Sequence, residues 1–328
     1  MRRRDFISAV AAAAPFGWAS TARSQARRIH AVGILTNTSR ADPRVWIVGE
    51  TLRALGYVQE RNIHYVFRLS EGRQERLPDL AKELVAMGVD VIVAAATPAT
   101  KAAQQATGTI PIVGIAMADP VRDGLVRNYA SPEANITGNT FLGPELVPKR
   151  LSYLKELLPA IARVEVLWHP EAYAKQTMDD MVAETQRAAV ALNLLLNFVA
   201  ANKPEELDDA FANLAKDSPE AILEFPSQMF YANRDALVRL AAQHRIPSMW
   251  NAREFVELGG LIMYGTSLVD LSRHAAIYVD KLLKGAKPSE LPVEQPTKFE
   301  LLINAGTARE LNIPIPPNLL ARADEVIE

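Results

Sequence analysis

The feature that most constrains the fold is a regular alternation of short apolar segments and helix-like segments. Ile29–Leu35, Asp90–Ala96 and Ile110–Ala116 have the length and composition of buried strands. Between them lie segments with the apolar spacing of helices, such as Arg44–Leu55, which Gly56 closes. Continuous apolar strands separated by helices are typical of a parallel sheet covered by helices on both faces. The chain is therefore predicted to be an α/β protein.

The same alternation restarts after about residue 142. Strands are predicted at Arg163–Trp168, Leu194–Val199, Glu220–Phe225, Ile246–Trp250, Gly259–Tyr264 and Phe299–Asn304. A length of 328 residues is typical of about two domains, and no Gly/Ser-rich linker separates the halves. We therefore predict two Rossmann-like lobes with parallel sheets, joined by short crossing strands. Residues 29–142 form lobe 1, joined by part of about 260–328, and residues 143–259 form lobe 2.

The first 24 residues have the pattern of a cleavable export signal. A basic start, Arg2-Arg3-Arg4, precedes an apolar stretch from Phe6 to about Trp18, and Ala22-Arg23-Ser24 is a small-x-small cleavage pattern. The apolar stretch is shorter than the roughly 20 residues that span a bilayer. Because Arg3-Arg4 is followed by x-Phe-Ile, the signal resembles the twin-arginine type, with the Sec route as the alternative. The protein is predicted to be periplasmic.

Composition and charge exclude several classes of protein. The chain is 49% hydrophobic and 23% charged, as ordinary globular proteins are. Its net charge is −2, and about −5 without residues 1–24. This argues against a nucleic-acid partner, because a protein that binds the phosphate backbone presents a basic face to it. The chain has no cysteine, which excludes a lipid anchor on cysteine, disulfides and thiol chemistry. We expect a freely soluble monomer.

Motifs for catalysis and cofactor binding are missing from the sequence. Neither G-x-G-x-x-G nor G-x-x-x-x-G-K-[ST] follows an early strand, and no G-x-S-x-G occurs. The histidines have no metal-ligand spacing: they are His30, His64, His169, His244 and His274. We therefore expect no cofactor, no metal and no catalysis.

Three strand exits in the first half carry a polar residue followed by proline. They are Asp42-Pro43, Thr97-Pro98 and Asp119-Pro120. Such pairs are typical of helix starts, so each is predicted to begin a helix, including a short one at Val121–Tyr129. In a parallel sheet these helix starts share the carboxyl edge, where their unpaired N–H groups favour an anion such as a carboxylate. Plain capping is the alternative for each pair.

The corresponding edge of the second half is rich in aromatic residues. Its strand exits are Trp168-His169-Pro170, Glu224-Phe225-Pro226-Ser227, Trp250-Asn251 and Tyr264-Gly265-Thr266-Ser267. Only 7% of the chain is aromatic, yet every one of these exits carries a ring, which predicts a flat apolar ligand held between rings. Core packing is the alternative for each ring. Asp119 or Glu224 is a candidate partner for a ligand ammonium, with capping as the alternative for Asp119.

Several short segments together resemble a known family. They are Leu52-Arg53-Ala54-Leu55-Gly56-Tyr57, Ala95-Ala96-Thr97-Pro98-Ala99, Ile110-Pro111-Ile112-Val113 leading to Asp119-Pro120, Asn135-Ile136-Thr137-Gly138, Arg253-Glu254-Phe255 with Gly259-Gly260, Gly285-x-Lys287-Pro288 and Pro296-Thr297-Lys298-Phe299-Glu300. Over nearly the whole chain after residue 24, the sequence resembles the ABC-transporter substrate-binding proteins of the group with tryptophan- and tyrosine-binding members. The resemblance implies a type I periplasmic-binding-protein fold that closes on a ligand and presents it to a membrane permease.

Carried onto this chain, the resemblance implies ligand contacts at the Thr36-Asn37 loop, Thr97-Pro98-Ala99, Asp119-Pro120, the Phe225-Pro226 turn and Tyr264-Gly265. Where many members have Asn-Pro after the first strand of the second lobe, this chain has Trp168-His169-Pro170. Together with the strand exits, the predicted ligand-binding set is Thr36, Asn37, Thr97, Pro98, Ala99, Asp119, Trp168, Glu224, Phe225, Trp250, Asn251, Tyr264 and Gly265.

The function predicted from these observations is solute binding for an ABC uptake system. The expected ligand is a small carboxylate-bearing solute, an aromatic or branched amino acid for example, and the expected partner is an ABC permease in the inner membrane. Two alternatives stay open at this point. One is a solute sensor that docks on a membrane kinase, and the other is a periplasmic hydrolase or isomerase that uses His169 with Glu224 or Asp119.

Overall fold

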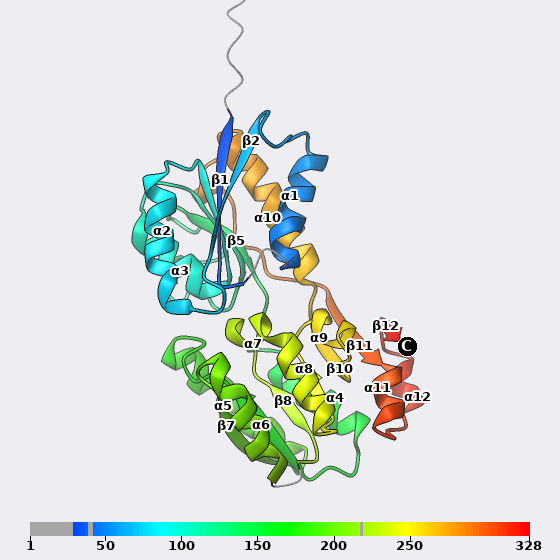
Figure 1. The fold of residues 1–328 in the computed structure, drawn as a ribbon. Helices are drawn as coiled ribbons and strands as arrows, with labels where there is room; N and C mark the ends of the chain where they lie inside the picture. Colours follow the sequence, from blue (N-terminus) through cyan, green and yellow to red (C-terminus); the bar gives the residue numbers. More distant parts are fainter. Residues whose placement is uncertain (1–28, 39–41, 217–218) are drawn as a thin grey trace, which may run out of the picture.

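The computed structural model describes residues 29–38, 42–216 and 219–328, and in these residues the chain forms two lobes (Figure 1). The predicted export signal, residues 1–24, lies outside the described residues. Within the described part of the chain, no helix is both long enough and apolar enough to cross a membrane.

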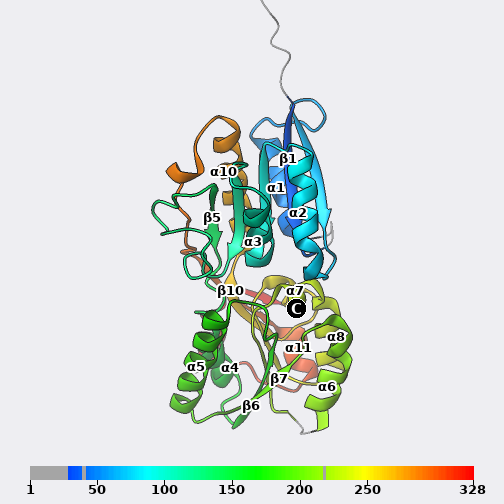
Figure 2. The ribbon, with the colours of Figure 1, turned by 90° about the vertical axis from the view of Figure 1, so that its left-hand side faces the viewer.

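Lobe 1 is built on a five-stranded, all-parallel sheet with the order β2-β1-β3-β4-β5. Its strands are β1 (His30–Thr36), β2 (Ile63–Leu69), β3 (Val91–Ala95), β4 (Ile112–Met117) and β5 (Ile136–Thr140). Its α-helices are α1 (Pro43–Ala54), α2 (Leu77–Ala86), α3 (Ala96–Ala106) and α10 (Leu268–Leu283). Helices α1 and α10 cover one face, and α2 and α3 cover the other (Figures 1 and 2). Because both faces are covered, β1, β3 and β4 are almost wholly buried, as their continuous apolar sequences predict.

Lobe 2 has a seven-stranded sheet with the order β12-β11-β10-β9-β8-β6-β7, in which only the β10–β11 pair is antiparallel. Its strands are β6 (Arg163–Trp168), β7 (Leu195–Ala200), β8 (Ile222–Glu224), β9 (Ser248–Trp250), β10 (Ile262–Thr266), β11 (Phe299–Asn304) and β12 (Glu325–Ile327). Its α-helices are α4 (Val147–Leu157), α5 (Lys175–Ala191), α6 (Leu207–Lys216), α7 (Gln228–Ala232), α8 (Arg234–Gln243), α9 (Arg253–Glu257), α11 (Ala305–Glu310) and α12 (Pro317–Leu320). Short 3-10 helices occur in both lobes: η1 (Gln74–Arg76) and η3 (Pro288–Glu290) lie with lobe 1, and η2 (Pro204–Glu206) lies with lobe 2.

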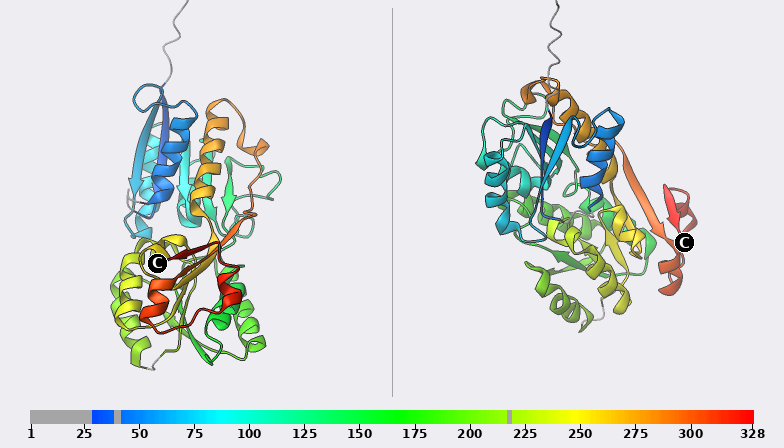
Figure 3. Two further views of the ribbon diagram at one scale, coloured as in Figure 1. Left: turned by 90° about the vertical axis from the view of Figure 1, so that its right-hand side faces the viewer. Right: turned by 45° about the horizontal axis from the view of Figure 1, so that its top comes forward.

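The C-terminal third of the chain is divided between the lobes (Figure 3). Helix α10 packs against α1 and the lobe 1 sheet, and the segment after η3 bonds to β5, where the Glu294 amide donates to the Gly138 carbonyl (2.9 Å). Strands β10, β11 and β12 complete the lobe 2 sheet. The part of residues 260–328 that lies with lobe 1 is therefore α10 and the segment that follows it, and lobe 2 extends beyond residue 259.

The chain crosses between the lobes three times: from β5 to α4, from β10 to α10 and from η3 to β11. The fully buried Arg150 of α4 joins two of these crossings. Its Nε donates to the Tyr264 carbonyl (2.6 Å) and its Nη1 donates to the Gly143 carbonyl (3.1 Å). The Thr266 hydroxyl also donates to the Phe141 carbonyl across the same two crossings (2.7 Å). The hinge is therefore a set of crossing segments that are hydrogen-bonded to one another.

The predicted helix at Val121–Tyr129 is wrong. The chain makes a single turn there, in which the Asp123 amide donates to the Asp119 carbonyl (2.9 Å). Gly124 then adopts a left-handed backbone (φ 69°), which ends the turn before a second one forms. Strand β12 was not predicted, because three residues, of which only Ile327 is half-buried, carry too little pattern to be recognised.

Two glycines test the packing of β4 against β5 in the lobe 1 sheet. We expect Gly138→Ala to lower the free energy of unfolding by about 2 to 4 kcal/mol, because Gly138 has φ 135° and an added Cβ would overlap the Gly114 carbonyl of the neighbouring strand. The control is Gly72→Ala, since Gly72 also has positive φ (85°) but has no atom within 4 Å of the added Cβ, and should cost about 1 kcal/mol. Equal losses in urea denaturation would contradict the packing of β4 against β5.

Candidate ligand-binding cleft

A cavity of about 460 Å³, including its mouth, lies between the two lobes. Lobe 1 and the start of α10 supply Arg44, Ala96, Thr97, Pro98, Ala116, Phe141 and Leu268 to its lining. Lobe 2 supplies Ala172, Tyr173, Pro226, Ser227, Gln228, Tyr231 and Asn251. Because both walls contribute to the lining, a molecule held there touches both lobes.

The lobe 1 wall depends on two alanines in left-handed backbone conformations. Ala96 (φ 68°) lies where β3 passes into α3, and Ala116 (φ 56°) lies in β4, where the register with β5 shifts. Such conformations are rare outside glycine and concentrate at functional sites. Hydrogen bonds hold Ala116 and Ala118 in place. The Ala116 amide donates to Asn139 Oδ1 (2.9 Å), and the Ala118 amide donates to the Thr97 hydroxyl (3.0 Å). The strand ends therefore bring backbone and small side chains to the cavity.

The three predicted helix starts have different outcomes. Asp42 caps α1 as predicted, because its side chain accepts from the Arg44 amide (2.9 Å). Thr97-Pro98 is not a cap, since α3 begins at Ala96 and both residues lie within its first turn. Asp119-Pro120 begins only the single turn described above, in which Asp119 Oδ1 accepts from the Arg122 amide (3.0 Å) and Oδ2 pairs with the Arg122 side chain (3.3 Å). The N-terminal turn of the eleven-residue α3 is thus one of the helix ends that line the cavity, together with the starts of α1, α7 and α10.

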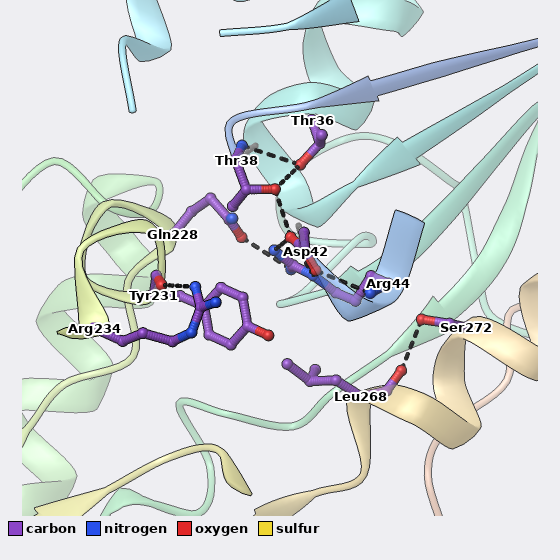
Figure 4. Close-up of polar contacts among 9 residues, drawn as sticks. All are labelled: Thr36, Thr38, Asp42, Arg44, Gln228, Tyr231, Arg234, Leu268 and Ser272. Atoms are coloured by element: carbon purple, nitrogen blue, oxygen red, sulfur yellow. Dashed lines mark hydrogen bonds and ion pairs between the residues drawn. The ribbon is translucent and has the colours of Figure 1, made fainter. Parts of the chain in front are cut away.

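The lobe 2 wall carries the rings of Tyr173 and Tyr231, opposite Phe141 of the first crossing. The guanidinium carbons of Arg44 and Arg234 lie 4.5 and 5.0 Å from the centre of the Tyr231 ring (Figure 4). These contacts are cation–π interactions, which fix the orientation of the ring. The cavity therefore combines aromatic walls with few charged groups.

Ser227 lines the cavity and contacts His169, with 3.0 Å between the hydroxyl and Nδ1. The same hydroxyl oxygen accepts from the Met229 and Phe230 amides (3.2 and 3.4 Å), so it caps α7. Burial lowers the pKa of His169 below its ordinary value, which leaves the imidazole neutral at pH 7. The pair therefore fixes the start of α7, where Gln228 and Tyr231 reach the cavity.

Glu224 lies fully buried behind the cavity wall and holds Asn251, which lines it. Asn251 Nδ2 donates to Glu224 Oε2 (2.5 Å). Burial raises the pKa of Glu224 to about 8, against the opposing effects of the Arg150 charge and the Asn251 hydrogen bond. Burial also lowers the pKa of Arg150 to about 10. Glu224 therefore positions a cavity residue, with no place of its own in the lining.

Three of the thirteen residues predicted to bind ligand line the cavity: Thr97, Pro98 and Asn251. The other ten are not in the lining and contact other parts of the protein. Ala99 is buried in α3, and Thr36 and Asn37 are buried at the end of β1, where Asn37 accepts a hydrogen bond from Ser70.

The predicted aromatic residues pack elsewhere in lobe 2. Phe225 and Trp250 are core residues: the Phe225 ring meets Phe198 edge-on (5.8 Å), and the Trp250 ring stacks on Phe255 (4.6 Å). Trp168 lines a separate depression beside α5. The Tyr264 ring packs on Tyr153 (4.9 Å). Gly265 lies so close to the Asn251 carbonyl that a Cβ would overlap it.

Sequence reasoning missed most of the side chains that line the cavity. Arg44, Phe141, Tyr173, Gln228 and Tyr231 were not predicted. A usable signal was the distance from a strand end, since Arg44, Tyr173, Gln228 and Tyr231 follow predicted exit residues by one to four positions. Phe141 likewise directly follows β5. Side chains just beyond a strand end face the cleft, whereas the last residues of a strand face the helix-covered sides of the sheet.

A chain of two α/β lobes that share one small cavity has the architecture of a bilobal solute-binding protein. The sequence model of the ABC transporter substrate binding protein family matches residues 36–327, and the chain belongs to this family. A tyrosine-binding protein of Clostridioides difficile (strain R20291) is 24% identical over 266 residues, which are 80% of this chain and 75% of that protein.

Two solved structures share the fold of this chain. An ABC domain from Streptococcus pneumoniae, in complex with L-Trp, is 26% identical with a TM-score of 0.82, and the match covers 91% of this chain and 100% of that chain. A leucine-binding protein from Thermotoga maritima MSB8 shares the fold at 14% identity, with a TM-score of 0.57 over 80% of this chain and 85% of that chain. The predicted type I periplasmic-binding-protein fold is therefore confirmed.

The raised pKa of Glu224 predicts a pH dependence of stability. Between the ordinary value of 4.5 and about 8, the folded protein keeps a proton that the unfolded chain releases, so the free energy of unfolding falls as pH rises. From about pH 5.5 to about pH 7.5 we expect the wild type to lose about 1 to 2 kcal/mol more than Glu224→Gln, as measured by urea unfolding. Parallel pH profiles for the two proteins would show that Glu224 is ionised in the fold.

Proposed function

We propose that this protein is the periplasmic solute-binding component of an ABC uptake system and that its ligand is a small carboxylate-bearing solute, an aromatic amino acid above all. The observation that carries the proposal is the cavity shared by both lobes, in which the N-terminal turn of α3 faces aromatic rings. The relatives whose ligands are tyrosine and L-Trp support the same class of solute. The predicted export signal and family membership support the periplasmic location and the permease partner.

The two ends of the cavity suit the two ends of an aromatic amino acid. The unpaired amides and the dipole at the start of α3 attract a carboxylate. The rings of Phe141, Tyr173 and Tyr231 offer faces and edges to a flat side chain. Arg44, the charged side chain in the lining, is paired with Asp42 (2.6 Å). A zwitterion with no net charge therefore suits the cavity better than a dianion.

Binding in this cavity changes the equilibrium between open and closed lobes. A solute that touches both walls has more contacts in the closed arrangement than in the open one, so it binds the closed state more tightly. Rotation about the three crossings is the natural route of closure, because each lobe has its own sheet and core. The closed form is then the species that a permease distinguishes from the empty protein.

Comparison of L-tryptophan with tryptamine tests the carboxylate. We expect the purified protein to bind L-tryptophan, L-tyrosine or L-phenylalanine, and to bind tryptamine at least about 30-fold more weakly, because tryptamine lacks the group that the α3 amides hold. Isothermal titration calorimetry measures both affinities. Binding of none of these amino acids, or equal affinity for tryptamine, would rule out this ligand assignment.

A pair of aromatic variants tests the cavity wall. Phe141→Leu should weaken binding of the amino acid about tenfold, because the ring lines the cavity. Tyr264→Leu is the matched control, since its ring packs on Tyr153 outside the lining and its loss should change the affinity by less than about twofold. The opposite order of effects would mean that the ligand lies at the Tyr264 side of the hinge.

A further inference from the structure

The contact that spans the cleft most directly is made by Arg44, a lobe 1 residue whose guanidinium reaches lobe 2. Its Nη1 donates to Gln228 Oε1 (3.1 Å), and its guanidinium carbon lies 4.5 Å from the Tyr231 ring centre (Figure 4). Both partners belong to α7, which is separated from Arg44 by more than 180 residues of sequence. These contacts exist only while the lobes are together.

Asp42 holds this guanidinium in place from within lobe 1. Its carboxylate accepts from Arg44 Nη2 (2.6 Å), from Arg44 Nε (3.0 and 3.1 Å to its two oxygens) and from the Arg44 amide (2.9 Å). The Thr38 hydroxyl donates to the same carboxylate (2.5 Å) and lies 2.9 Å from the Thr36 hydroxyl. Burial alone would raise the pKa of Asp42, but the charge and hydrogen bonds of Arg44 hold it below its ordinary value. The pair is therefore fully charged and fixed to the end of β1.

The burial of this pair distinguishes the contact of Arg44 with α7 from an ion pair that crosses the cleft at another place. Arg44 and Asp42 are 3% and 1% exposed. Arg122 of lobe 1 also pairs with Asp180 of α5, but these side chains are 52% and 39% exposed. Exposed ion pairs contribute little because water screens them, whereas a buried guanidinium strongly requires partners for its N–H groups. Of the two contacts, the buried one is the stronger determinant of closure.

The geometry points to Asp42 as a positioning residue that presents Arg44 to Gln228 and Tyr231. Through these contacts Arg44 stabilises the closed cleft before any solute is bound. In this arrangement Arg44 Nε and Nη2 bond to Asp42 and Nη1 bonds to Gln228. Arg44 therefore meets the ligand as half of a neutral pair, and its role is closure. The inference rests on the proposed function only for the existence of an open and a closed state.

The distance between the lobes in the ligand-free protein tests this inference. Because the chain has no cysteine, Lys101→Cys on α3 and Arg187→Cys on α5 give two exposed labelling sites, one in each lobe. Electron–electron double resonance between spin labels then reports the ratio of closed to open protein. We expect Gln228→Ala and Asp42→Asn each to lower this ratio at least about fivefold, since each removes a contact of a charged group. Combining the two changes should add little, because both act through Arg44.

Arg234→Gln is the matched control. Arg234 also lies over the Tyr231 ring, at 5.0 Å, but it follows Tyr231 in the same lobe, so its loss removes a cation–π contact without affecting closure (Figure 4). Asn at position 42 keeps the helix cap, and Gln228→Ala leaves lobe 1 intact, so both variants should fold. An unchanged distance distribution in Gln228→Ala, or an equal change in Arg234→Gln, would overturn the inference. Since no ligand is added, failure of amino-acid binding would not affect this result.

Discussion

The arrangement of the molecule follows from one constraint: the parallel sheets of the two lobes face each other with their carboxyl edges. A parallel sheet buries both faces under helices, so its strand ends are where backbone groups and side chains stay accessible. In lobe 1 the ends of β3, β4 and β5 supply cavity residues, and in lobe 2 the segments after β6, β8 and β9 do the same. The cavity therefore lies where two such edges meet, and the crossings that join the lobes lie beside it.

The fold was largely predictable because its signal is distributed over many residues. The strands at Arg163–Trp168 and Phe299–Asn304 have the predicted bounds, since the apolar pattern continues along the whole element. The division of the C-terminal third between the two lobes was harder to predict from the sequence. Nothing local in β11 indicates that it pairs antiparallel with β10 in lobe 2, because strand pairing is decided by tertiary packing.

The site was predicted at the strand ends, where the cavity lies, but the rings that were predicted do not line this cavity. Trp250 is the last residue of β9 and Phe225 directly follows β8, so both side chains turn into the helix-covered faces and become core. Tyr173 and Tyr231 come after the chain has turned and face the cleft. The left-handed alanines, Ala96 and Ala116, were equally hidden, since alanine carries no sequence signal for a conformation that usually requires glycine. The Ala116 amide is held by a distant residue, since it donates to Asn139 Oδ1 (2.9 Å).

The cavity wall and the hinge share one buried polar cluster, which bears on how binding and closure are related. Asn251 lines the cavity and donates to Glu224, while Arg150, whose charge acts on Glu224, bonds to carbonyls in two of the crossings. Gly265, at the end of β10, lies directly against the Asn251 carbonyl, so the crossing to α10 and the cavity wall are in contact. Closely packed interiors transmit displacement. A ligand that contacts Asn251 therefore contacts the same cluster that holds the crossings together. Arg44 lies on the opposite wall, and its contacts with Gln228 and Tyr231 form only when the lobes are closed.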